Sequence, residues 1–113
     1  MQTMDNLRSP NERTYGLEHV AVGVDVRVST LSLVGDECVP WHWHTRTSDI
    51  FFCLEGTAVV ETHNPGNARL VNVGERYDVP PGVPHRVTPL GGKRCRFVLV
   101  QGVGKADFHP GRP

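Results

Sequence analysis

The chain has 113 residues, and its 12 lysine and arginine residues balance 12 aspartate and glutamate residues, so the formal net charge is zero. This length fits one domain and leaves no room for two. Without a basic surplus the chain has little sequence-independent attraction to nucleic acid or to an anionic membrane, so we expect neither as a partner. The longest apolar runs, such as residues 50–54, are strand-sized, and no membrane span is expected.

The N-terminal residues and the cysteines favour a cytoplasmic protein. Residues 1–13 are polar and lack the apolar core of a secretory signal. Three cysteines are an odd number, and no two of them form a Cys-x-x-Cys pair, which disfavours a disulfide framework and a thiolate zinc site. We therefore expect reduced thiols.

Glycine and proline divide the chain into short pieces, so helices are not expected. Valine occupies every second position from residue 20 to residue 28, which predicts one half-buried strand. The apolar phase shifts at residues 30–33, which predicts a bulge or a second strand bending round a corner. Further short strands are predicted over residues 41–44, 49–54, 57–62, 69–73, 85–88 and 94–101. Turn-forming residues separate them, and such a series is typical of an all-β sandwich or small barrel.

The expected organisation is an N-terminal arm at residues 1–14, a single domain at residues 15–103 and a C-terminal tail at residues 104–113. The ends are polar or rich in glycine and proline. We expect them to be mobile or docked only through a partner subunit.

Three histidines and one aspartate form the main candidate site. His42 and His44 are two residues apart on a predicted strand, so both imidazoles point to one face and can share one ion. Asp49 opens the next apolar strand, and its carboxylate reaches the same face if the intervening residues form a tight connection. His85 follows a proline-rich segment that restricts the backbone. Three imidazoles and a carboxylate suit several divalent transition metals, whereas an isolated His-x-His pair would more often face solvent.

The spacing of these residues resembles the two motifs of the cupin superfamily. The first reads Gly35, six residues, His42-Trp43-His44, four residues, Asp49, six residues and Gly56. The second reads Gly74, five residues, Pro80-Pro81-Gly82, two residues, His85, three residues and Pro89. The resemblance implies a cupin β-barrel, an all-β, jelly-roll-like double-stranded β-helix. It also implies one divalent transition metal (Fe, Mn, Zn or Ni) bound by His42, His44, Asp49 and His85.

Asp49 stands where the family usually has glutamate. Its side chain is one methylene shorter, so the alternative is that it lies behind the ligands of a three-histidine site with open positions. Similar sites in thiol and diketone dioxygenases accept substrate and O₂ there. The resemblance thus implies a metal-dependent dioxygenase or another cupin enzyme acting on a small oxygenated or carboxylated molecule. A non-catalytic small-ligand-binding or sensor protein and a cupin isomerase or lyase stay open as alternatives.

Strand parity places Asp49, Phe51 and Cys53 on one face and Phe52 and Leu54 on the other. A small-molecule ligand is expected in a mostly apolar pocket. Its expected wall comprises Phe51, Cys53, Tyr77, Val83, Val87 and Arg46. Because both faces of this strand are apolar and few elements are left to cover the second, we expect a homodimer, with a covering N-terminal segment as the alternative. The remaining histidines, His19, His63 and His109, are expected at the surface.

Overall fold

A computed structural model describes residues 16–63, 66–102 and 108–111, and these residues form β-strands and turns without an α-helix. The expected N-terminal arm lies outside the described residues. The strands are β1 (Gly16–Val22), β2 (Val26–Leu33), β3 (Val39–Trp43), β4 (Ser48–Glu55), β5 (Thr57–Thr62), β6 (Asn67–Asn72), β7 (Arg76–Val79), β8 (His85–Pro89), β9 (Cys95–Gly102) and β10 (His109–Pro110), with one 3₁₀ turn, η2 (Leu90–Gly92). The all-β prediction is confirmed. No helix in the described part of the chain could cross a membrane.

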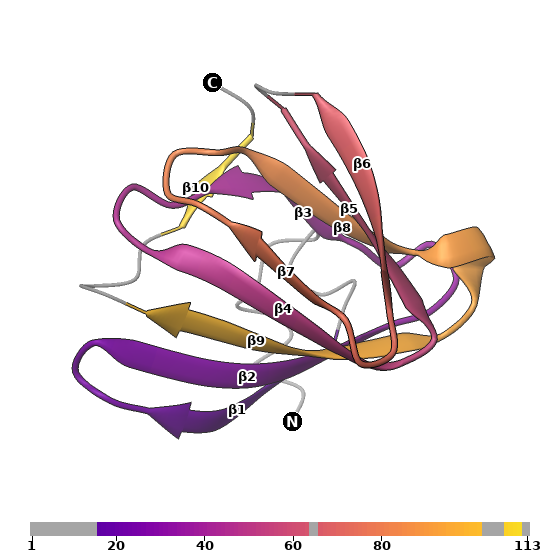
Figure 1. Cartoon of the computed structure of the whole chain (residues 1–113), viewed down its shortest axis with the longest axis horizontal. Helices are drawn as coiled ribbons and strands as arrows, with labels where there is room; N and C mark the ends of the chain where they lie inside the picture. The colour runs from indigo at the N-terminus through magenta and orange to yellow at the C-terminus, as the bar shows by residue number, and fades with distance from the viewer. Residues whose placement is uncertain (1–15, 64–65, 103–107, 112–113) are drawn as a thin grey trace, which may run out of the picture.

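Two five-stranded antiparallel sheets face each other (Figure 1). One sheet has the order β1-β2-β9-β4-β7 and the other the order β10-β3-β8-β5-β6. Most neighbouring strands are distant in sequence, as in a jelly roll or double-stranded β-helix, so the expected barrel is confirmed. The core between the sheets is apolar. Leu33, Val60, Val87 and Phe97 have no exposed surface.

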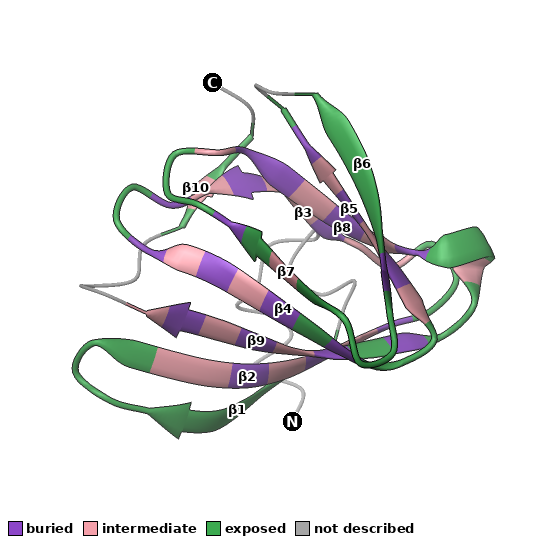
Figure 2. Cartoon of the chain, in the orientation of Figure 1, coloured by how far each residue is buried: buried purple, intermediate pink, exposed green. Residues whose placement is uncertain are grey.

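Alternating side chains build this core. Along β4 and β9, buried residues alternate with half-buried or exposed ones (Figure 2). Cys95, Phe97, Leu99 and Gln101 are the buried residues of β9. The first three are apolar and the last is polar, so the inward face of β9 becomes polar only at its C-terminal end. That end holds the candidate site.

The alternating valines do not form one strand, and this prediction is wrong. A turn at residues 23–25 separates β1 from β2, and the N–H of Gly23 donates to the carbonyl oxygen of Val26 at 2.6 Å. Val24, inside the turn, is 92% exposed. The period of two continues across the hairpin because its turn also carries a valine, so the pattern alone does not mark the break.

No bulge or corner interrupts residues 30–33 in the pairing of β2 with β9, which is continuous from Val26 to Leu33. The apolar phase shifts for another reason. Ser29, Leu31 and Leu33 face the core, whereas Val26 and Val28 lie on the opposite face of the sheet. The outer face of this sheet is therefore apolar as well.

Residues 108–111 dock on their own chain, contrary to the expectation for the tail. β10 pairs antiparallel with β3, and the His109 ring stacks on Trp43 with 4.3 Å between ring centroids. A two-residue strand has no period to detect, which explains why the sequence pattern does not predict it. His109 is thereby half-buried beside the strand that carries His42.

Candidate metal centre

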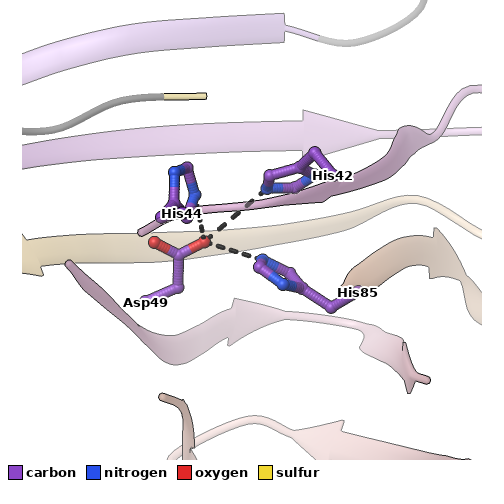
Figure 3. A group of neighbouring side chains, drawn as sticks. All are labelled: His42, His44, Asp49 and His85. Carbon is purple, nitrogen blue, oxygen red and sulfur yellow. Dashed lines mark hydrogen bonds and ion pairs between the residues drawn. The ribbon is translucent and has the colours of Figure 1, made fainter. Parts of the chain in front are cut away.

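The ends of three strands bring the four predicted ligands together (Figure 3). His42 lies near the end of β3, and His44 follows that strand. His85 opens β8 as the register partner of His42, while Asp49 is the second residue of β4 in the facing sheet. All four residues are at most 4% exposed. Strand pairing within one sheet and the contact between the two sheets therefore fix their positions.

The ligand atoms converge on one carboxylate oxygen. The Nε2 atoms of His85, His44 and His42 lie 2.8, 3.1 and 3.7 Å from Oδ2 of Asp49 (Figure 3). All four ligand atoms lie within 4.8 Å of one another. Asp49 is thus part of the same cluster as the imidazoles, despite being shorter than the usual glutamate.

Backbone contacts fix the orientation of two rings. Nδ1 of His42 donates to the carbonyl oxygen of Pro40 at 2.7 Å, and Nδ1 of His85 donates to that of Val83 at 2.9 Å. A carbonyl oxygen can only accept, so each Nδ1 carries a proton; Nε2 then holds a lone pair in the neutral ring and donates a hydrogen bond in the imidazolium. At 2.8 Å from His85, the Asp49 carboxylate oxygen is an acceptor too. A cation has to lie between two such acceptors, and either a proton or a metal ion meets that need.

The local electrostatics keep the carboxylate charged. Burial alone would raise the pKa of Asp49, but hydrogen bonds with His42, His44 and His85 outweigh it and hold that pKa well below the ordinary value. Burial lowers the pKa of His42 below 6.5, although the hydrogen bond with Asp49 opposes the shift. A charged carboxylate beside a neutral imidazole is the ionisation state that metal ligands require.

Gln101 belongs to the cluster but was not among the predicted site residues. It is 5% exposed, and its Nε2 donates to Oδ1 of Asp49 at 3.0 Å. The other side of the amide contacts Arg27. A polar residue at an inward position of an otherwise apolar strand is the signal that could have found it.

Phe108 is a second residue that the sequence pattern does not indicate. Its ring stacks on His42 with a centroid distance of 4.5 Å and an interplanar angle of 18°. It also lies 6.0 Å from the His44 ring. The side chain is 39% exposed, so the ring lies at the surface beside these two histidines.

The structure brings only part of the expected pocket wall to the histidines. Phe51 lies 6.1 Å from the His85 ring, and Val83 holds that ring through its carbonyl group. Cys53 is four residues beyond Asp49 on β4, where its thiol contacts the carbonyl oxygen of Gly56 at 3.3 Å. Four residues of strand span about 13 Å, so this thiol lies away from the cluster.

The other expected wall residues have different surroundings. Val87 is wholly buried in the core. Tyr77 packs partly against the core, with the Arg69 guanidinium 5.2 Å from its ring centroid. Arg46 is exposed in the connection between His44 and β4. The arginine that reaches the cluster, through Gln101, is instead Arg27.

The comparisons with known proteins agree with this architecture. Residues 32–101 match the family model described as the cupin domain. The chain belongs to the cupin family. The matched segment contains all four residues of the cluster, as the resemblance of the two sequence motifs implies. The comparison with curated proteins gives no match.

Several solved structures share the fold at low sequence identity. A conserved protein with a double-stranded β-helix domain from Klebsiella pneumoniae is 21% identical, with a TM-score of 0.79 over 96% of this chain and 94% of that one. An oxalate oxidase in complex with glycolate is 18% identical, with a TM-score of 0.71 over 88% of this chain and 55% of that one. A chain from crystal structures of DMSP lyases is 17% identical, with a TM-score of 0.72 over 88% and 54%. The cupin chain described here thus spans about half the length of these two enzyme chains.

Proposed function

We propose that this cupin binds one divalent transition metal through His42, His44, His85 and Asp49. The observation that carries the proposal is the pairing of acceptors. Nε2 of His85 lies 2.8 Å from Oδ2 of Asp49, two further imidazole nitrogens lie within 3.7 Å of the same oxygen, and neutral rings with the proton on Nδ1 would leave only acceptors there. A bound cation converts this unfavourable arrangement into a ligand set, and nitrogen and oxygen donors suit Fe, Mn, Zn or Ni.

We further propose that the metal centre is enzymatic and acts on a small oxygenated or carboxylated molecule, in the manner of a dioxygenase. A bound metal of this kind supplies a Lewis acid or a centre for O₂ chemistry. The residues of the chain orient the proposed ligands and form the surroundings of the site. The Pro40 and Val83 carbonyl groups hold two imidazoles in one orientation, and the rings of Phe51 and Phe108 give the site apolar surroundings that favour a small organic ligand.

Elemental analysis tests the metal proposal directly. Protein purified without chelators or a histidine tag is compared with His42→Ala, His85→Ala and the matched control His63→Ala, whose imidazole is exposed outside the cluster. We expect near-stoichiometric metal in the wild type and in the control, and loss in the two ligand variants. Wild-type protein that holds no metal even after reconstitution would refute the proposal.

Oxygen consumption tests the reaction class. The loaded protein is incubated with small diketones, thiols and hydroxycarboxylic acids while dissolved O₂ and products are followed. Substrate-dependent O₂ uptake that is absent in His85→Ala supports the dioxygenase proposal. Product formation without O₂ uptake would contradict it and favour a lyase or isomerase. Saturable ligand binding without turnover would favour a sensor.

We also propose that a second copy of this chain covers the outer face of the β1-β2-β9-β4-β7 sheet. On that face Phe52 is 37% exposed, Leu54 is 45% exposed and Val26 is 44% exposed, although all three are apolar. Burying such a patch is favourable, and a two-fold dimer is its commonest form. Light scattering should give a dimer for the wild type and for the control Leu90→Asp, and a monomer for Phe52→Asp. A monomeric wild type would contradict this arrangement.

A further inference from the structure

Three polar residues form a row across neighbouring strands of one sheet. Arg27 on β2 is the register partner of Gln101 on β9, and Gln101 is in turn the register partner of Asp49 on β4. Their side chains meet in the barrel interior, since each contacts the next by hydrogen bonds. The row connects half-buried Arg27 with a residue that faces all three histidines.

Arg27 determines which end of the Gln101 amide faces the cluster. Its Nε and one terminal nitrogen both donate to Oε1 of Gln101, at 2.9 and 2.6 Å. A guanidinium has five donors and no acceptor, so only the oxygen of the amide can bind it in this way. The amide nitrogen is thereby turned toward Asp49, where it donates to Oδ1 at 3.0 Å.

The orientation of the Gln101 amide in turn determines the orientation of the Asp49 carboxylate. Oδ1 of Asp49 is occupied by Gln101, whereas Oδ2 is the oxygen that the three Nε2 atoms surround. A reversed amide would place its oxygen against Oδ1, and two acceptors at that distance would repel each other. We infer that Arg27 acts through Gln101 as a positioning residue, which keeps the Asp49 carboxylate turned so that Oδ2 alone faces the histidines. The role rests on the proposed metal binding and makes Asp49 a ligand through a single oxygen.

Cobalt binding to the full-length protein tests this role. Co²⁺ affinity is measured by competition with a chelator, and the visible absorption bands of bound Co²⁺ report the coordination sphere. The variants are Arg27→Met, Gln101→Met, the conservative Arg27→Lys, and the control Arg96→Met, which removes an exposed guanidinium from β9. Substituting a residue that orients a metal ligand typically lowers the metal affinity about 10- to 100-fold.

We expect Arg27→Met and Gln101→Met to lose affinity in that range and to shift the Co²⁺ bands. Arg27→Lys, which keeps a donor for Oε1, should recover part of the affinity and the original bands. If circular dichroism shows that Arg27→Met is unfolded, the Co²⁺ affinities and spectra of Arg27→Lys and Gln101→Met test the positioning role instead. Variants that bind Co²⁺ with wild-type affinity and spectrum would overturn the positioning role alone. A wild type that binds no Co²⁺ would overturn the proposed function and this role together.

Discussion

Replacing His85 with alanine should abolish most of the stabilisation that a bound metal gives to the fold. A ligand that binds only the folded state, present at 100 times its dissociation constant, adds about 2.7 kcal/mol to the free energy of unfolding. For 113 residues the entropy of unfolding is about 0.24 kcal/mol/K near 60 °C, so the melting temperature should rise by about 11 °C. His85 is the residue whose removal should matter most, because its Nε2 lies nearest to Asp49 Oδ2.

If the substitution weakens binding about 100-fold, the same metal concentration adds only about 0.4 kcal/mol, or about 2 °C. The assay is thermal unfolding of chelator-treated protein with and without added Zn²⁺ or Mn²⁺. The quantity compared between variants is the rise in melting temperature on adding metal. The melting temperature itself is not compared, because the substitution also changes the stability of the metal-free protein. His63→Ala should keep the full shift. Equal shifts in His85→Ala and wild type would refute the assignment of His85 as a ligand.

Three further predictions concern the backbone, a thiol and protonation. Gly56→Ala should lower the free energy of unfolding, measured by urea titration, by at least about 2 kcal/mol. The backbone φ of Gly56 is +69°, and a Cβ there would collide with the carbonyl oxygen of Arg94. A loss below about 0.5 kcal/mol would contradict this reasoning. Burial raises the pKa of the Cys95 thiol to about 11. Mass spectrometry after iodoacetamide treatment at pH 8 should therefore find half-buried Cys38 modified well before Cys95. Early modification of Cys95 would contradict its burial in the core. Metal affinity, measured by chelator competition, should be flat above pH 7 and fall as the pH drops through the histidine range, because protonated imidazoles do not bind metal. Burial lowers the pKa of His42 below 6.5, so this ring stays neutral to lower pH. Tighter binding at pH 5 than at pH 7 would contradict this ionisation state.

Most of the buried cluster of histidines and aspartate could be predicted because the positions of its residues depend on local spacing. His42 and His44 are close through the period of a strand, and the connection to Asp49 is too short to allow many alternatives. His85 is distant in sequence, and only its resemblance to a second motif linked it to the others. The structure adds the register pairing of His42 with His85, which no pattern within either strand contains.

The missed residues depend on contacts between distant strands. Arg27 and Gln101 are neighbours only because β2 pairs with β9 in one particular register, which neither strand specifies alone. The hairpin at residues 23–25 was missed because the valine period continues through it. In each case local periodicity was informative about the faces of a strand and uninformative about its partner.

The docking of Phe108 has a consequence for how this fold can diversify. The four proposed ligands lie in or next to strands that are paired and packed against the core, so substitutions around them also disturb the packing. Phe108 instead precedes a two-residue strand that pairs only with the end of β3, yet its ring stacks on His42. Under the proposed function, substitutions in this one short segment change the size and polarity of the surface beside His42, while the four proposed metal ligands stay the same.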